Sequence, residues 1–345
     1  MKQGKTLTQL AQEIERRNAS KLDFIADTRA LNFDAKNIQI GDKGRYAITD
    51  HTHGQIAARL NIPKKYYDRM QTDAPALLIN NVRHWFDAQP ERRMIRTLDG
   101  NARAFLSDRY RKLDNFDLCE AILPIILESD SMKIISCDVT DKKLYIKALF
   151  PKLETEIKKG DAVQSGIVIS NSEIGLSSLR VEPLVYRLVC LNGLISKDYG
   201  TRKYHVGRAC EGDEAIAEIY RDETLQADDK AFWLKVQDIV IASMSESKFK
   251  LIVDKFRDTQ GIKIINPIHA VEVVANKFTF NHDEKSGVLR SLIQGADLSG
   301  YGLINAVTDY AKFIDKYDRA TEFERIGGSI IELPKTDWQA IAQAA

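Results

Sequence analysis

The run E-R-R-M-I-R-T-L-D-G-N-A-R-A-F-L-S-D-R-Y-R-K-L-D-N, residues 91–115, decides the expected fold of this 345-residue chain. Its centre, Asp99-Gly100, separates the short runs Met94–Leu98 and Ala102–Leu106. Both turn residues tolerate a positive φ, and Asp-Gly between two such runs is a strong hairpin signal. We therefore predict a β-hairpin here.

The second arm of this hairpin has an alternating pattern. Successive side chains of a strand point to opposite faces. One face is expected to carry the small and aliphatic residues and to pack on the core. Arg103 and Phe105 are then expected together on the other, polar face.

The hairpin region has a local excess of positive charge. Seven basic residues stand against three acidic ones between Glu91 and Lys112, although the whole chain has a net charge of only +1. Arginine pairs bidentately with phosphate, and neighbouring aromatic rings can stack on bases, so the pattern favours a polyanion-binding surface. A charged strand edge with surface ion pairs is the structural alternative. The residues assigned to nucleic-acid binding here are Arg92, Arg93, Arg96, Arg103, Phe105, Arg109, Tyr110, Arg111 and Lys112.

A second basic block follows between Arg180 and Arg208, with six basic residues against two acidic ones. Its separation from the first block is less than one domain length, so we expect both blocks to line one groove. Phe105, Tyr110 and Tyr204 are the expected base-stacking residues. The second block adds Arg180, Arg187, Arg202, Lys203, Tyr204, His205 and Arg208 to the candidate nucleic-acid-binding set.

Composition sets the class of protein. A hydrophobic content of 44% and a charged content of 29% exclude wholesale disorder, and the near-neutral charge excludes a uniformly basic binder. The four cysteines form no C-x-x-C pair and are expected to be reduced core thiols. The chain has no apolar run as long as a membrane span and starts without a signal-peptide pattern, so a cytoplasmic protein is expected.

The order of elements predicts an α+β fold: a central, mostly antiparallel sheet with flanking helices, followed by a helical C-terminal region. Three parts are expected. Residues 1–90 form a strand meander with helices, residues 91–208 an α/β core, and residues 209–345 a helical region. The acidic run Glu211–Asp229 reads as a solvated helix face, or as the face that docks the basic surface of another copy in a homo-oligomer.

Four local interpretations accompany this outline. The pattern from Gln55 to Met70 fits a DNA-reading helix-turn-helix, although two-helix corners are common. Pro124 implies a kink or early end of its helix. Cys190 is expected inside a buried strand, and Asn192-Gly193 is expected to form the turn after it.

Three stretches of the chain resemble one family. They are R-T-L-D-G-N-A-R-A-F-L-S-D-R-Y-R-K-L-D-N (96–115), S-N-S-E-I-G-L-S-S-L-R (170–180), and Y-R-L-V-C-L-N-G-L-I (186–195) followed by Tyr204-His205. They are similar to the phage- and plasmid-borne family labelled domain of unknown function nine hundred and thirty-two. That resemblance covers roughly residues 55–208. It implies a mobile-element origin and a DNA-metabolism context, and it carries no agreed activity.

No nucleotide-binding loop, metalloprotease motif or hydrolase motif occurs in the sequence. The pair His51-x-His53 lacks a third ligand, so neither a metal nor a cofactor is expected. The leading hypothesis is a non-catalytic protein that binds single-stranded DNA, or anneals it, in recombination or replication. An enzyme that uses the same basic groove as a substrate clamp, and a self-assembling interaction module, are the alternatives.

Overall fold

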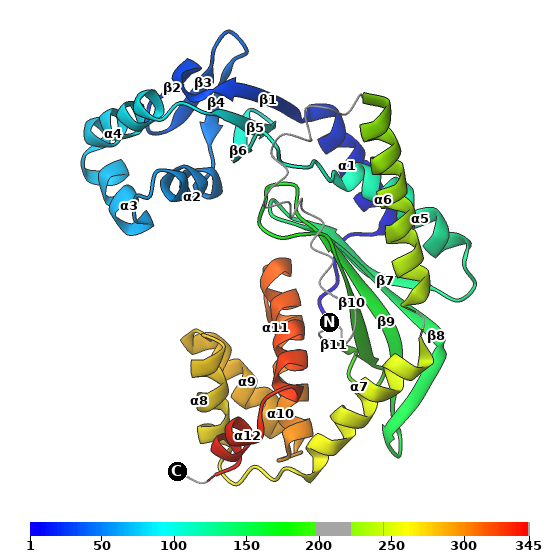
Figure 1. The fold of residues 1–345 in the computed structure, drawn as a ribbon. Coiled ribbons are helices and arrows are strands. Elements are labelled where there is room, and N and C mark those ends of the chain that lie inside the picture. Colours follow the sequence, from blue (N-terminus) through cyan, green and yellow to red (C-terminus); the bar gives the residue numbers. More distant parts are fainter. Residues whose placement is uncertain (197–221, 244, 344–345) are drawn as a thin grey trace.

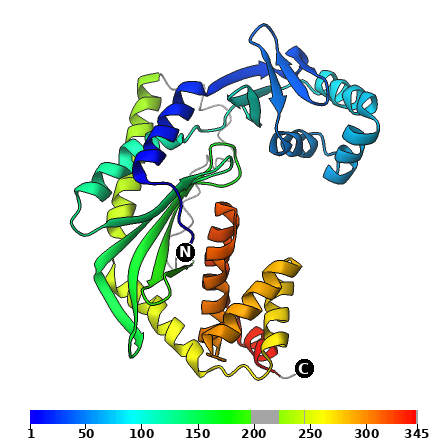
Figure 2. The same cartoon turned by 180° about the vertical axis from the view of Figure 1, so that it is seen from behind.

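A computed structural model describes residues 1–196, 222–243 and 245–343. The chain has an open, C-shaped outline (Figures 1 and 2). A first sheet with its helices forms one end, a second sheet forms the back, and C-terminal helices form the other end. The fold is α+β, as predicted, with two mostly antiparallel sheets where one was expected.

The first sheet has six strands in the order β1-β5-β6-β4-β3-β2. The short N-terminal strands form the predicted meander, and the hairpin β5–β6 is inserted between β1 and β4. The hairpin therefore shares a sheet with strands that precede residue 90. The division of the chain into three parts at residues 90 and 208 stays a prediction. The strands are β1 (Leu22–Asp27), β2 (Leu31–Phe33), β3 (Asn37–Ile40), β4 (Arg45–Ile48), β5 (Arg92–Leu98) and β6 (Asn101–Ser107).

Helices cover one face of this sheet. Ile56, Leu78 and Val82 from α2 and α4 pack on Ile38 and Phe105 of the sheet in one buried cluster. Thr49 caps α2 by accepting a hydrogen bond from the Thr52 amide. The helices of this part are α1 (Leu7–Ser20), α2 (Asp50–Arg59), α3 (Lys64–Asp73) and α4 (Pro75–Ala88).

The hairpin is confirmed, but its faces differ from the prediction. Asp99 and Gly100 make the turn with φ of 50° and 77°. Arg96 pairs with Ala104 and Thr97 with Ala102, so Arg103 is one extra residue in β6 and forms a bulge. The bulge shifts the alternation, and Ala102 joins Phe105 on the helix-covered face. The expected polar face with Arg103 and Phe105 side by side is wrong, because both side chains are buried.

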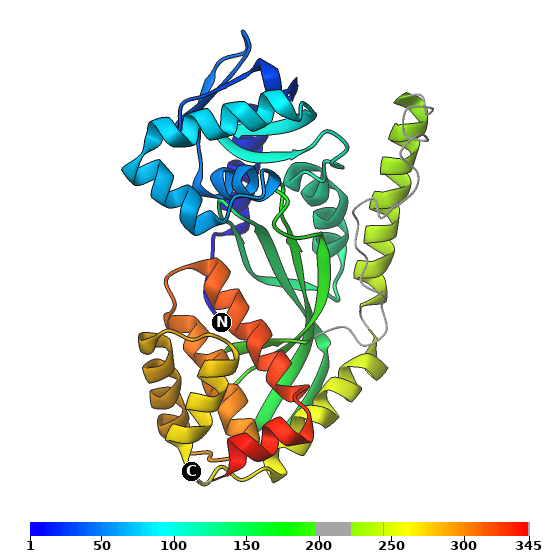
Figure 3. The same cartoon turned by 60° about the vertical axis from the view of Figure 1, so that its left-hand side comes forward.

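The second sheet has five antiparallel strands in the order β11-β10-β9-β8-β7 and is covered on both faces. Ile146 and Ile167 face α5 (Asn115–Glu128) and α6 (Asp222–Ala242). Alternate residues such as Lys147 face α11 (Tyr317–Ile331), which lies on the opposite side of the sheet from α6 (Figure 3). The strands are β7 (Lys133–Val139), β8 (Leu144–Lys158), β9 (Asp161–Asn171), β10 (Arg180–Arg187) and β11 (Asn192–Ile195).

The C-terminal region is helical, as predicted. Its helices enclose a core that includes Val253, Val274, Leu303 and Phe323 and reaches Val185 of the second sheet. Within the described part of the chain, no helix combines the length and apolar character needed to cross a membrane. The remaining helices are α7 (Glu246–Asp258), α8 (Pro267–Lys277), α9 (His282–Gly295), α10 (Gly300–Tyr310) and α12 (Lys335–Ala342), with short 3₁₀ turns at Thr28–Ala30, Thr259–Gly261 and Ala311–Phe313.

Two local predictions are wrong. β10 ends at Arg187, so the half-buried Cys190 lies in the turn that follows, with Leu191 at a φ of 52°. Asn192 starts β11 and is buried; its Nδ2 donates to Thr308 Oγ1 at 2.6 Å on α10. Of the two outcomes expected at Pro124, a kink or an early end of the helix, the early end is not found, because Pro124 lies inside α5 and the helix continues to Glu128.

Candidate functional site

The loop after β9 joins the two sheets. The Ile174 carbonyl lies 2.8 Å from His51 Nε2 and accepts from Gln55 Nε2 at 3.0 Å, both on α2. The Glu173 carbonyl accepts from Arg96 Nη1 at 2.9 Å, and Tyr110 donates to the Ser172 carbonyl at 3.3 Å. Residues 96–115 and 170–180, two of the stretches that carry the family resemblance, therefore meet at one polar junction.

Arg96 is the centre of this junction and is fully buried. It donates to Asp23 at 2.8 and 3.2 Å and to Asp114 at 2.5 Å. Burial alone would lower the pKa of Arg96, but the two carboxylates outweigh burial and raise it. Lys21 also pairs with Asp114 at 2.5 Å. The expected contact between Arg96 and a nucleic acid is therefore wrong for this structure, because the guanidinium is enclosed by protein.

Arg103 is also a buried structural arginine. Its Nη1 donates to Glu173 Oε2 at 2.8 Å, while Glu173 Oε1 accepts from the Asn115 amide at the start of α5. The carboxylate of Glu173 thus connects β6 to the N-terminus of α5, where negative charge is favourable. Nε and Nη2 of Arg103 have no hydrogen-bond partner among the described residues.

Phe105 and Arg93 form a packed stack. The Phe105 ring is 1% exposed and lies parallel to Phe86, with ring centroids 5.8 Å apart. The Arg93 guanidinium lies 4.8 Å from the centre of the Phe105 ring. The stacking role expected for Phe105 is wrong for this structure, because protein covers its ring.

Arg187 belongs to the opposite end of the second sheet. It donates to both carboxylate oxygens of Asp161 at 2.5 and 2.7 Å, and Tyr301 donates to the same carboxylate at 2.6 Å. This network fastens β10 to α10. Arg187 is therefore not brought together with the hairpin residues in one groove.

The remaining residues assigned in the first block lie at the start of the hairpin or after it. Arg92 and Arg109 are exposed. Lys112 is exposed and pairs with Asp23 at 3.2 Å. Arg111 lies 4.8 Å from the centre of the Phe232 ring on α6 and pairs with Asp228 at 3.2 Å. Tyr110 is half-buried, and burial raises its pKa.

Part of the second block cannot be placed. Arg202, Lys203, Tyr204, His205 and Arg208 lie outside the described residues, as does most of the acidic run Glu211–Asp229. Arg180 of that block is described and is exposed at the start of β10.

Arg180 belongs to a cationic cluster that the sequence did not indicate. Arg180 is opposite Ser170 in β9, and Ser170 is opposite Tyr145 in β8. The Oγ atom of Ser170 accepts from Arg325 on α11 at 3.3 Å, so this row faces α11. Lys143 precedes Tyr145 by two residues and approaches the same face. We call Lys143, Arg180 and Arg325 the α11-face cluster.

The charges of this cluster affect one another. Burial, followed by the positive charges of Arg325 and Arg180, lowers the pKa of Lys143. Arg325 is neutralised by Glu182, to which its Nη2 donates at 2.6 Å. Lys143 Nζ and the Arg180 guanidinium make no hydrogen bond or ion pair with the described residues. The two unneutralised cations make this face suitable for an anionic ligand.

The corner formed by α2 and α3, which fits a helix-turn-helix in sequence, leaves fewer side chains exposed for a ligand. Tyr67 on α3 is fully buried and its hydroxyl lies 2.9 Å from His53 Nδ1, while Lys64 bonds to Asp50 and Asp68 at 2.9 and 2.6 Å. Tyr66 and Arg69 remain exposed. The described residues contain no group of three His, Cys, Asp or Glu side chains arranged for a metal ion, so neither His51 nor His53 belongs to such a group.

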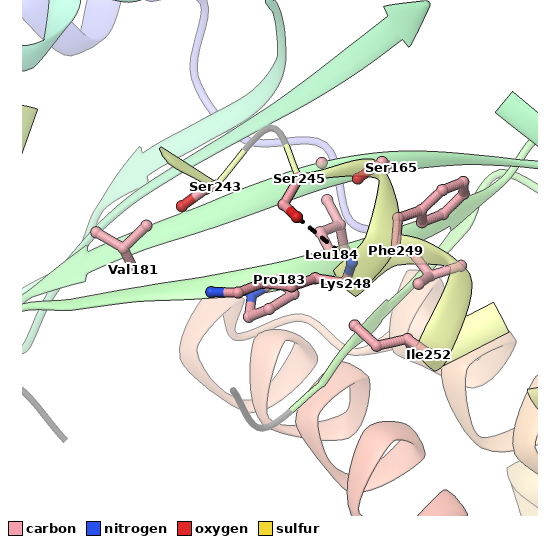
Figure 4. A pocket seen from close by; sticks show the side chains of 11 residues that line it. Ser165, Val181, Pro183, Leu184, Ser243, Ser245, Lys248, Phe249 and Ile252 are labelled. Atoms are coloured by element: carbon pink, nitrogen blue, oxygen red, sulfur yellow. Dashed lines mark hydrogen bonds between the residues drawn. The ribbon is translucent and has the colours of Figure 1, made fainter. Parts of the chain in front are cut away.

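A small cavity lies on the other face of β10, beside the start of α7 (Figure 4). Val181 and Pro183 alternate with the residues that face α11, and they line this cavity together with Ser243, Ser245 and Phe249. Its volume is about 30 Å³. A space of this size holds water but no organic ligand.

Residues 104–322 match the family described as domain of unknown function (DUF932), which is more than half of the chain. The chain belongs to this family, as its resemblance predicted. The match includes the junction loop, the second sheet and only the start of α11, since it ends at residue 322. Comparison with curated proteins and with solved structures gave no match.

Proposed function

We propose that this protein binds nucleic acid without catalysing a reaction on it, and that single-stranded DNA is its partner. The observation that supports the proposal is the pair of unneutralised cations in the α11-face cluster, Lys143 and Arg180. Nucleic-acid binding depends largely on neutralising backbone phosphates with lysine and arginine. Among the described residues, no carboxylate forms an ion pair with either side chain, so both can pair with phosphate.

The buried arginines serve this surface indirectly. Arg96 and Arg103 hold Glu173 against the first sheet. The same loop leads into Arg180, which starts the next strand. In this proposal the two buried arginines position the phosphate-binding face and do not touch the ligand.

Biological context supports the same proposal. The family resemblance implies phage or plasmid DNA metabolism, in which proteins that coat or anneal strands act. Coating a strand with several copies requires self-association, so a homo-oligomer on DNA is part of the proposal. Light scattering on the protein with and without a long oligonucleotide measures this directly.

The test is fluorescence anisotropy with a labelled oligonucleotide, single-stranded or annealed to its complement, over a salt titration. Lys143→Ala and Arg180→Ala are each expected to weaken binding similarly for unrelated sequences. Each is expected to reduce the slope of log affinity against log salt by about one, since each removes one phosphate contact.

Lys159→Ala is the matched control. Lys159 is exposed in the turn between β8 and β9, at the far end of the same sheet, so its loss changes the net charge equally. Wild-type binding is expected in this control. Wild-type affinity in the Lys143→Ala/Arg180→Ala double variant would overturn the proposal.

A further inference from the structure

Lys143 has an environment that differs from that of the lysine beside it. Lys142 and Lys143 both lie in the turn between β7 and β8, but Lys142 is exposed and Lys143 is half-buried. Lys143 points to the face of the sheet that carries Arg180 and Arg325. Its amine is not among the fully buried polar atoms that lack a partner, so solvent reaches it.

The groups that face Lys143 come from three elements. Arg180 and Glu182 lie on β10, Tyr145 on β8, and Asp318 and Arg325 on α11. The two carboxylates are already engaged. Glu182 accepts from Arg325 at 2.6 to 3.1 Å, and Asp318 accepts from Tyr145 at 2.9 Å and from Thr140 at 3.2 Å. Neither carboxylate forms an ion pair or a hydrogen bond with the Lys143 ammonium.

We propose that Lys143 is a reactive amine and an acylation site of this protein, taking acyl groups from anionic donors of the acyl phosphate class. Burial and two neighbouring guanidinium groups both disfavour the ammonium form, so the free amine is more abundant than at an exposed lysine. The free amine is the nucleophile. The unneutralised Arg180 attracts the dianionic phosphate of the donor to the same place.

The reaction balances with acetyl phosphate as donor. The nitrogen of Lys143 forms an amide bond to the acyl carbon while the bond from that carbon to the phosphate oxygen breaks. The amine proton ends on the departing phosphate, which leaves as hydrogen phosphate. The product has lost the lysine charge and with it one cation of the α11-face cluster. This inference goes beyond the proposed function, because the reactivity does not depend on nucleic acid.

The experiment incubates the intact protein with acetyl phosphate at several pH values. It measures acetylation of each lysine by mass spectrometry after digestion with a protease that does not cleave at lysine. Lys143 is expected to be acetylated several-fold faster than Lys142 near neutral pH. Lys142 is the internal control, because it is adjacent in sequence and more exposed than Lys143, so faster acetylation of Lys143 cannot come from better access of the reagent. Equal or slower acetylation of Lys143 would overturn the proposal.

A second variant separates the two causes. Arg180→Gln removes an exposed charge, and the pH profile of Lys143 acetylation is expected to move to higher pH while Lys142 is unchanged. A neutral acylating ester is expected to lose less rate in this variant than acetyl phosphate does. An unchanged profile with both reagents would contradict the role of Arg180. Oligonucleotide binding is measured on the same samples, so a protein that acetylates at Lys143 but binds no DNA would refute the proposed function alone.

Discussion

Arg103 is buried with two of its three guanidinium nitrogens unpaired within the described part of the chain. One nitrogen pairs with Glu173, while Nε and Nη2 find no partner among the described residues. A buried ion pair contributes little net stability, but removing one partner leaves the other charge buried and uncompensated. The side chain therefore matters more for folding than for any contact at the surface.

Arg103→Ala is expected to lower the free energy of unfolding by about 3–5 kcal/mol, because Glu173 would remain buried without its cation. Arg92→Ala is the control, since Arg92 is exposed at the start of β5. Its effect is expected within about 0.5 kcal/mol. Urea unfolding of both variants measures the difference. Equal stability of the two would show that Arg103 is not a structural residue.

His53 gives the stability a pH dependence. It is 4% exposed, between the Tyr67 hydroxyl and the Gln71 amide, each 2.9 Å from a ring nitrogen. Burial, followed by the charge of Lys64, lowers its pKa from 6.5 to about 4. The unfolded chain binds the proton more tightly than the folded one in this interval, so stability falls as the pH decreases from 6.5 towards 4.

His53→Phe is expected to be less stable than wild type at pH 7.5, by about 1–3 kcal/mol, since the Tyr67 and Gln71 groups lose a partner. Its stability is expected to change less between pH 6.5 and 4, because the ring no longer titrates. His282→Gln, at an exposed histidine, should keep the wild-type pH dependence. Thermal unfolding at a series of pH values tests this, and parallel curves for the two variants would contradict it.

At the scale of elements, the hairpin shows which features were predictable. Asp99-Gly100 is a local turn signal, and the structure confirms the turn and both strands. The bulge at Arg103 has no such signal, because it depends on how the arginine reaches Glu173, 70 residues away in the chain. Strict alternation of side chains along β6 therefore predicts the wrong faces, because the bulge at Arg103 interrupts it.

The contact between α11 and β11 is another feature without a local signal. Two consecutive glycines, Gly327 and Gly328, disfavour a helix, yet both lie in the middle of α11. A Cβ atom on Gly328 would lie 2.0 Å from the Ile195 carbonyl oxygen. The glycine pair thus allows α11 to approach the edge strand β11 closely. The sequence alone shows that two glycines disfavour a helix, but it does not show the close contact that requires them.

Gly328→Ala is expected to destabilise the protein by about 1–3 kcal/mol or more, because the clash is with backbone and can be relieved only by moving α11. Gly295→Ala is the matched control. Gly295 ends α9, and a Cβ there meets no atom within 4 Å. The control is expected to be neutral or more stable by up to about 1 kcal/mol. Denaturant midpoints distinguish the two, and a neutral Gly328→Ala would show that α11 does not pack this closely.

At the scale of the molecule, the candidate site is assembled from three distant parts of the sequence. Lys143 lies in a turn, Arg180 at the start of a strand and Arg325 in a helix that periodicity did not indicate. Charge counting along the chain found clusters only where basic residues are neighbours in sequence. Arg96, Arg103 and Arg187 were assigned to a surface for that reason, whereas their carboxylate partners at 23, 114, 173 and 161 are brought to them by the fold.

Two buried ion pairs hold the large parts of the molecule together. Arg103–Glu173 connects the first sheet to the loop of the second, at 2.8 Å. Lys147–Glu324 connects the second sheet to α11, at 2.6 Å, with both side chains fully buried. The Lys147 amine also lies 4.8 Å from the centre of the Tyr317 ring. The first pair lies in the loop after β9 and the second on the face of the sheet that packs on α11, so the two pairs share no residue.

Glu173→Gln and Glu324→Gln keep the size of the side chain and remove its charge, and each serves as the control for the other. In Glu173→Gln, amide hydrogen exchange is expected to accelerate in β6 and in the first turn of α5, because the Asn115 amide and Arg103 lose their charged acceptor. In Glu324→Gln, acceleration is expected in α11 and β8, where Lys147 is left unpaired in the interior. Protection at the other junction should stay at the wild-type level in each case. Faster exchange around both ion pairs in either variant would mean that the sheets and α11 open as one cooperative unit. Neither ion pair would then stabilise only its own contact.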